Sequence, residues 1–162
     1  MPRVVSFVSA LLAVAPWGSD LGAAAGRGQE RDLQKLAPPP GSNVARISAQ
    51  NVDISTFVSN RTDAAGTRFS IVLDITPAPR VHVYAPQVVG YKPIALTVRK
   101  QPGLVVEAAH YPKSGNYFFA PLKENVPVYS EPFRIVQDIS LNGPSELKID
   151  GTLSYQACDD RI

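Results

Sequence analysis

The sequence predicts an all-β fold, an immunoglobulin-like antiparallel β-sandwich. Apolar and polar residues alternate with a period of two along much of the chain, and Pro, Gly or Asn turn signals interrupt this alternation at regular intervals. The chain also contains 15 prolines spread along its length, which disfavour long helices. About seven short strands separated by such turns are typical of a sandwich of immunoglobulin size.

The first strands are predicted over residues 69–75, 81–84 and 94–98, where every second residue is apolar. Pro77 and Pro79 end the first of them. Residues 104–110 form a further candidate, which stops before Pro112. The apolar faces of the first and third strands are Phe69, Ile71, Leu73 and Ile75, and Ile94, Leu96 and Val98.

Two later strands are predicted over residues 133–141 and 147–157, the second with an apolar face of Leu147, Ile149, Leu153, Tyr155 and Ala157. Residues 111–131 are rich in Pro, Gly, Asn and aromatic residues without a clean period. We expect a long loop there, and loops of that length inside compact domains often carry function. No helix of useful length is expected between residues 46 and 162.

Three segments are expected along the chain. Residues 1–25 have the charged start, the short apolar run and the small-residue cleavage site of a secretory signal peptide. Residues 26–45 are polar and then proline-rich, as in an extended tether, and residues 46–162 form the sandwich domain. We therefore expect a periplasmic or secreted bacterial protein in an oxidising compartment.

Composition argues against several functions. The net charge is +2 and no Lys/Arg cluster stands out, so neither nucleic acid nor an anionic membrane is an expected partner. No Gly-rich phosphate loop, Gly-x-Ser-x-Gly motif or recognisable carboxylate pair points to an enzyme acting on small molecules.

Cys158 is the only cysteine, and an odd cysteine in an exported protein suggests a reactive thiol or an intermolecular bond. If the last strand stays regular, Cys158 shares a face with Ser154 and Gln156, away from the core residue Ala157. Position therefore favours an accessible thiol. Its flanking charges act in opposite directions, since Asp159 and Asp160 disfavour the thiolate and Arg161 partly offsets them.

The tail Tyr155-Gln156-Ala157-Cys158-Asp159-Asp160 resembles the end of the periplasmic N-terminal domain of the DsbD family of thiol:disulfide interchange proteins. Val81-His82-Val83-Tyr84 is similar to that family's aromatic strand beside its cysteine pair. Residues 111–129 are similar to the segment that contains the loop capping its active site. Together these similarities cover roughly residues 50 to 162.

The resemblance implies an immunoglobulin-like sandwich with no cofactor. It also implies a cysteine pair that takes electrons from a thioredoxin-like domain, fed by a membrane domain, and passes them to periplasmic disulfide proteins, as in cytochrome c biogenesis. Cys158 matches the first cysteine of the pair, and His82, Tyr84, Tyr155 and Gln156 lie in the matching segments around it. Phe118 and Phe119 match the place of a shielding aromatic residue of the cap loop.

This sequence departs from the family pattern at the second cysteine, which would come just after Ile162. We therefore expect a domain truncated at its C-terminal end, whose link to a membrane would run through a missing downstream segment. A lone Cys158 can form a mixed disulfide but cannot resolve it within the chain. We expect the chain as given to be incomplete as a thiol:disulfide interchange component, that is, as part of a protein-disulfide reductase.

Two other functions stay open. The first is an exported immunoglobulin-like protein-binding module with no redox role, for which Cys158→Ser would leave function untouched. The second is a blue-copper centre formed by Cys158, His82 and His110, since these are its ligand types. The spacing is poor and the only methionine is Met1, so no metal is expected.

Overall fold

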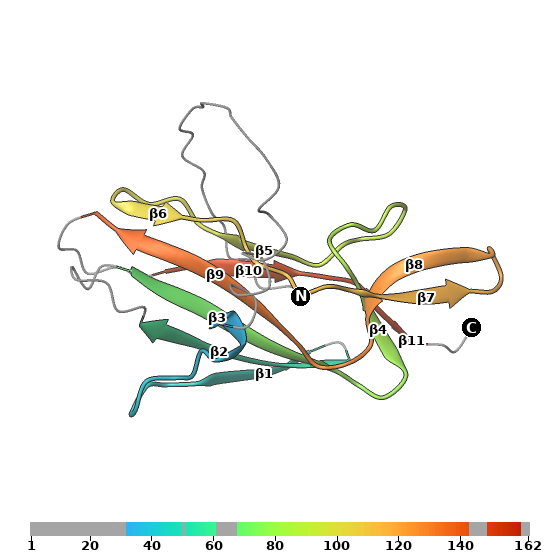
Figure 1. Ribbon diagram of the computed structural model, residues 1–162, viewed down its shortest axis with the longest axis horizontal. Helices are drawn as coiled ribbons and strands as arrows, with labels where there is room; N and C mark the ends of the chain where they lie inside the picture. The colour runs from blue at the N-terminus through green and yellow to red at the C-terminus, as the bar shows by residue number, and fades with distance from the viewer. Residues whose placement is uncertain (1–31, 50, 61–67, 143–148, 160–162) are drawn as a thin grey trace.

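The computed structural model describes residues 32–49, 51–60, 68–142 and 149–159, and these form the antiparallel β-sandwich that the sequence predicts (Figure 1). The predicted signal peptide, residues 1–25, lies outside the described residues. Among the helices of the described part, none is long and apolar enough to cross a membrane.

One layer is a five-stranded sheet in the order β1-β2-β3-β9-β6, in which all neighbours are antiparallel. Its strands are β1 (Ala45–Ala49), β2 (Val52–Asn60), β3 (Arg68–Pro77), β9 (Phe133–Leu141) and β6 (Leu104–Val106). The central pairing of β3 with β9 places Leu73 opposite Ile135 and Val72 opposite Val136. Each strand of this pair therefore presents apolar residues to both faces of the sheet.

The other layer consists of a four-stranded sheet, β11-β4-β8-β7, and a two-stranded sheet, β10-β5. Its strands are β4 (Val81–Tyr84), β5 (Ala95–Val98), β7 (Gly115–Phe119), β8 (Glu124–Tyr129), β10 (Gly151–Ser154) and β11 (Ala157–Asp159). In Figure 1 the hairpin β7–β8, β4 and β11 lie together at the right-hand end of the molecule. This is the end at which the only cysteine is found.

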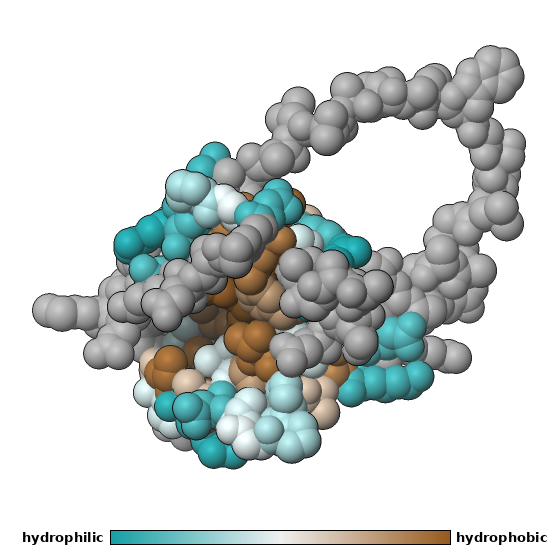
Figure 2. All heavy atoms as spheres, turned by 90° about the vertical axis from the view of Figure 1, so that its left-hand side faces the viewer, coloured by the Kyte–Doolittle hydropathy of each residue, from teal (hydrophilic) through white to brown (hydrophobic). Residues whose placement is uncertain are grey.

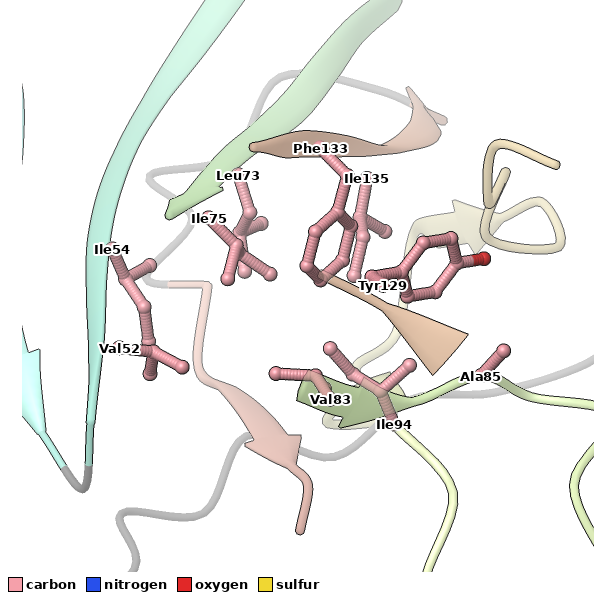
Figure 3. Close-up of a cluster of buried hydrophobic side chains, with 10 residues drawn as sticks. All are labelled: Val52, Ile54, Leu73, Ile75, Val83, Ala85, Ile94, Tyr129, Phe133 and Ile135. Atoms are coloured by element: carbon pink, nitrogen blue, oxygen red, sulfur yellow. The ribbon is translucent and has the colours of Figure 1, made fainter. Parts of the chain in front are cut away.

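The main core fills the space between the layers. Leu73, Ile75 and Ile135 from the five-stranded sheet pack with Val83 and Tyr129 from the four-stranded sheet (Figure 3). Burial of these side chains stabilises the fold through the hydrophobic effect, at about 1.5–3 kcal/mol for each fully buried large side chain. Seen from the left-hand end of Figure 1, hydrophobic residues gather in the middle of the molecule and hydrophilic residues lie around them (Figure 2).

A second cluster covers the outer face of the five-stranded sheet. Phe57, Val72 and Val136 are buried there beneath Leu33, which is 5% exposed and lies in a helical turn over residues 32–35. The sequence predicts an extended tether for residues 26–45, whereas residues 32–36 pack on the sheet. The physical reason is that the outward-facing valines of β3 and β9 expose apolar surface that this segment removes from water.

The hairpin β7–β8 occupies part of residues 111–131, so the prediction of a loop there is wrong. β7 is an edge strand in which the exposed Phe118 stands between the half-buried Tyr117 and Phe119, so aromatic residues on both faces remove the alternation that would reveal a strand. β1 and β2 also form in a stretch where the sequence predicts no strand, and β1 is mostly exposed.

The predicted last strand, residues 147–157, is also different in the structure. Within the described residues it divides into β10, which pairs with β5, and β11, which pairs with β4. Leu147 lies outside the described residues. The predicted strand 104–110 is shortened to β6, and His110 makes only an isolated bridge with Val136.

Candidate functional site

Cys158 is held by the short strand β11 against the inner strand β4. In the antiparallel register Cys158 lies opposite His82, and Ala157 lies opposite Val83. Ala157 packs against the main core, whereas Cys158 packs against a different cluster. Neighbouring residues of a strand point to opposite faces of the sheet, so Cys158 is directed to the outer face of the four-stranded sheet.

That outer face carries a cluster of aromatic and aliphatic side chains, which we call the aromatic face. Tyr84 from β4 and Val126 and Val128 from β8 are its buried members. The half-buried side chains packed against them are Val88, Tyr91, Tyr117, Phe119 and Cys158. Because Val88 and Tyr91 belong to the loop between β4 and β5, that loop folds back over the sheet beside the thiol.

Ring contacts fix the side chains around the sulfur. His82, which is 5% exposed, stacks on Tyr117 with 4.4 Å between ring centroids and meets Tyr84 edge to face at 5.3 Å. Tyr84 in turn stacks on Tyr91 at 4.5 Å. Such stacked and edge-to-face pairs add about 0.5–1.5 kcal/mol each beyond the burial of their area. The rings on the face that carries Cys158 are therefore held in place by one another.

Two polar groups contact Cys158 on this face. The Gln156 amide Nε2 lies 3.5 Å from Sγ, and its Oε1 accepts a hydrogen bond of 3.1 Å from the backbone N–H of Lys92. Tyr84, a buried member of the aromatic face, also interacts with Cys158. Burial, followed by the interaction with Cys158, raises the pKa of Tyr84 well above its ordinary value. The Tyr84 hydroxyl therefore keeps its proton at physiological pH.

Three residues predicted at the site, His82, Tyr84 and Gln156, thus lie beside the cysteine, and Phe119 packs on the same face of the sheet. Tyr155 does not, because its ring packs on the main core and its hydroxyl donates a 2.6 Å hydrogen bond to the Ala49 carbonyl.

The two predicted shielding residues occupy different environments. Phe118 is 57% exposed, and Phe119 packs on the aromatic face. They alternate along β7, so only one of them can point toward the sheet surface that holds Cys158.

Of the flanking charges, Asp159 is exposed at the end of β11. Asp160 and Arg161 lie outside the described residues, so their effect on the thiol stays a prediction.

Sequence reasoning missed Tyr91 and Lys92. Both belong to the loop between β4 and β5, where no periodicity exists to show which way a side chain or an N–H group points. Only the aromatic character of Tyr91 was available as a signal.

Within the described residues, no group of three or more His, Cys, Asp and Glu side chains could hold a metal ion. The two histidines lie in different sheets, because His82 belongs to β4 and His110 bridges to β9. An open hollow of about 670 Å³ also lies elsewhere, among residues that include Lys113, Glu131 and Arg134 but not Cys158. The chemistry of the described residues around Cys158 is therefore that of a thiol in an aromatic setting.

The adjacent phenylalanines provide a test of shielding. We expect Phe119→Ala to accelerate alkylation of Cys158 by iodoacetamide severalfold, because it removes a ring packed on the aromatic face, and Phe118→Ala to leave the rate unchanged. The measurement is the time course of alkylation of the folded protein at neutral pH. Equal rates for the two variants would show that Phe119 does not shield the thiol.

The family model described as "Thiol:disulfide interchange protein DsbD, N-terminal" matches residues 55–162. No curated protein and no solved structure shows a significant match to the chain. The matched region begins in β2 and contains every residue of the aromatic face, whereas the segment that covers the outer face of the five-stranded sheet precedes it.

Proposed function

Because the chain belongs to the family of the DsbD N-terminal domain, a family of periplasmic domains with a general role in thiol–disulfide exchange, we propose that Cys158 is its exchanging thiol. The observation that carries the proposal is the position of Cys158. It lies on the aromatic face beside His82 and Tyr84, and not among the side chains of the main core. Free cysteine with a purely structural role is usually a small buried hydrophobic residue.

The exchange step that Cys158 supports begins with loss of its proton to solvent. The thiolate attacks one sulfur of a partner disulfide, the partner's S–S bond breaks, and a mixed disulfide between Cys158 and the partner forms. The other partner sulfur leaves as a thiolate and takes up a proton. The chain has one cysteine, so a second thiol from outside it must release the mixed disulfide.

The partners that this step requires are proteins with accessible disulfides or thiols. A thioredoxin-like protein as electron donor and periplasmic disulfide proteins as acceptors fit the family's role. The aromatic face restricts direct access to the sulfur, which favours a partner that docks and displaces a shielding ring over a small soluble thiol.

Capture by a thioredoxin-like protein tests the proposal. Cys158 is first converted to a mixed disulfide with thionitrobenzoate and then mixed with a thioredoxin variant that keeps only its attacking cysteine. We expect release of coloured thionitrobenzoate together with a covalent complex on a non-reducing gel. Cys158→Ser is expected to abolish both signals.

Glutathione at the same thiolate concentration is the control for non-specific exchange. If the thioredoxin variant reacts no faster than glutathione, Cys158 is not part of a docking site for thioredoxin-like proteins, and the proposal fails.

The second candidate is a protein-binding module without redox activity. It is favoured by the exposure of large apolar side chains on two segments near the aromatic face: Val89 is 89% exposed, and Phe118 and Leu122 are 57% and 59% exposed. A partner that binds Cys158→Ser as tightly as the unmodified chain would support this candidate.

A further inference from the structure

The orientation of the Gln156 amide is determined by its surroundings. A glutamine side chain has one accepting end and one donating end. The backbone N–H of Lys92 faces Oε1 at 3.1 Å, so the accepting end is engaged by the loop between β4 and β5. The donating Nε2 is thereby directed at Sγ of Cys158, 3.5 Å away. The reverse orientation would place two donors against each other at Lys92.

Tyr84 provides a second donor. Its ring is held by stacking against Tyr91 and belongs to the cluster on which Cys158 packs. Because burial keeps the Tyr84 hydroxyl protonated, its proton is available to the sulfur whenever the sulfur carries negative charge. The two donors come from different elements, β4 and the connection between β10 and β11, and both lie on the face of the sheet that carries Cys158.

We propose that Gln156 and Tyr84 form a two-donor cradle that stabilises the Cys158 thiolate, and that the loop between β4 and β5 sets the orientation of Gln156 through the Lys92 N–H group. This inference rests on the proposed function and assigns these residues a role in it. Hydrogen-bond donors that are fixed before the reaction stabilise developing charge without a cost for reorganisation.

The cradle acts in both directions of exchange. When Cys158 attacks a partner disulfide, the attacking species is the thiolate, and donors fixed beside it stabilise that anion. When another thiolate attacks the partner sulfur of the mixed disulfide, Cys158 leaves as a thiolate, and the same donors stabilise the leaving group. No additional oxidant or reductant enters either step, because the disulfide passes from one sulfur pair to another.

Two substitutions test the cradle. Gln156→Glu keeps an oxygen for the Lys92 N–H but replaces the donor by an anion. We expect alkylation of Cys158 by iodoacetamide at neutral pH to slow about tenfold, with the pH profile displaced to higher pH. Tyr84→Phe removes one hydroxyl and is expected to displace the profile in the same direction by a smaller amount.

Matched variants separate the cradle from general effects on folding. Tyr155→Phe removes a hydroxyl that binds the Ala49 carbonyl on the opposite side, and Gln87→Glu introduces the same carboxylate at an exposed position of the loop between β4 and β5. Both are expected to leave the pH profile of alkylation unchanged. Thermal melting of each variant identifies any that do not fold. If Gln156→Glu does not fold, Tyr84→Phe decides the question alone.

The outcomes distinguish this inference from the proposed function. Profiles of Gln156→Glu and Tyr84→Phe that superimpose on that of the unmodified chain would overturn the cradle, even if thioredoxin capture succeeds. Displaced profiles together with failed capture would support the cradle while showing that the exchange partner is not thioredoxin-like.

Discussion

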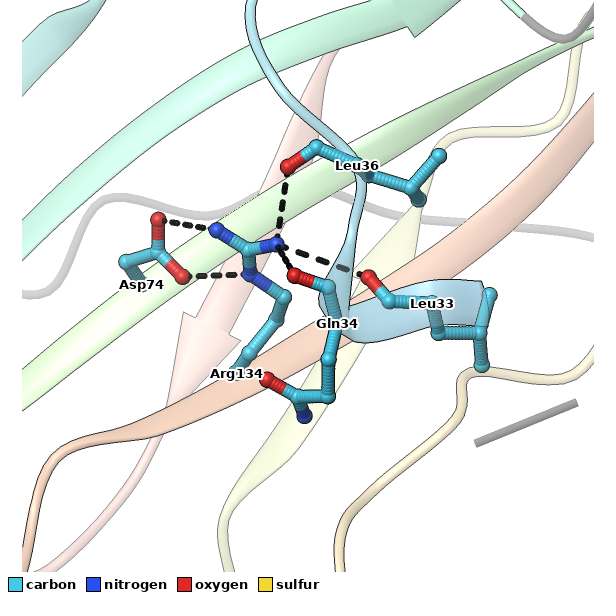
Figure 4. A network of polar contacts seen from close by, with 5 residues as sticks. All are labelled: Leu33, Gln34, Leu36, Asp74 and Arg134. Carbon is cyan, nitrogen blue, oxygen red and sulfur yellow. Dashed lines mark hydrogen bonds and ion pairs between the residues drawn. The ribbon is translucent and has the colours of Figure 1, made fainter. Parts of the chain in front are cut away.

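Replacing Arg134 by alanine is expected to lower the free energy of unfolding by about 3 kcal/mol, because a largely buried guanidinium joins two strands and the N-terminal segment. The Arg134 guanidinium donates two hydrogen bonds to the Asp74 carboxylate, from Nε to Oδ1 at 2.6 Å and from Nη2 to Oδ2 at 2.9 Å (Figure 4). Nη1 donates to the carbonyls of Leu33, Gln34 and Leu36 at 3.4, 2.9 and 2.8 Å. Loss of the guanidinium leaves Asp74 and all three carbonyls without this partner.

The substitution should also release Leu33 from the outer face of the five-stranded sheet. The carbonyls that Arg134 binds lie in and directly after a single helical turn, and such a short turn has little stability of its own. Arg134 also lies over the Phe57 ring, at 5.7 Å from its centroid, so the ring loses a cation as well. Denaturant unfolding measures the stability, and limited proteolysis measures exposure of the segment before β1.

Arg68→Ala is the matched control, since it removes an arginine from an ion pair of similar length. Arg68 lies 2.7 Å from Glu107, but the two side chains are 47% and 48% exposed. Exposed pairs of this kind contribute about 0.2–1 kcal/mol. Equal losses of stability in Arg68→Ala and Arg134→Ala would mean that the contacts of Arg134 with the N-terminal segment contribute little.

The sequence predicts those parts of the fold in which the two faces of a strand have different environments. β3 and β9 were predictable because one face of each strand is apolar and lies in the main core, whereas the other face has a different composition. β1 and β7 were not, since most of their side chains are exposed and edge strands need no alternation. The packing of residues 32–36 depends on Arg134 and Phe57, which lie far along the chain from them.

The same distinction applies to the site. Cys158 and its orientation follow from a count of cysteines and from strand parity, which are properties of the sequence. The contacts that define its environment depend on how the loop between β4 and β5 folds back, and the sequence holds no periodic signal for that. Gln156 was placed near the cysteine by its motif alone, whereas its role as a donor depends on the Lys92 N–H group.

Alkaline pH is expected to unfold the domain between about pH 10 and pH 12, with loss of most of the roughly 5–15 kcal/mol that is typical of such a domain. Burial raises the pKa of Tyr129 to about 12, and burial also raises the pKa values of Tyr84, Tyr111 and Tyr155. In the unfolded chain a tyrosine has a pKa of about 10. Below that pH the stabilisation by the neutral rings is fully present, and it is lost as the pH rises through the native pKa values, because the unfolded state releases protons that the folded state retains.

Tyr129 shows why these rings resist ionisation. Its ring stacks on Phe133 at 4.2 Å, and its hydroxyl donates a 2.7 Å hydrogen bond to the Pro112 carbonyl, so a phenolate there would lose its donor bond and face an acceptor. Tyr129→Phe cannot ionise. It is expected to cost about 1 kcal/mol at neutral pH through the lost hydrogen bond, yet its stability should fall less steeply above pH 10.

Tyrosinate absorbance and far-ultraviolet circular dichroism, followed together during an alkaline titration, measure this coupling. We expect most of the tyrosinate signal to appear in one cooperative step that coincides with loss of the strand signal, since the buried phenols ionise only when the sandwich opens. Gradual titration of the phenols near pH 10 in a protein that keeps its strand signal would mean that these rings reach solvent without unfolding, and would contradict the packing of Tyr129 and Tyr155 between the layers.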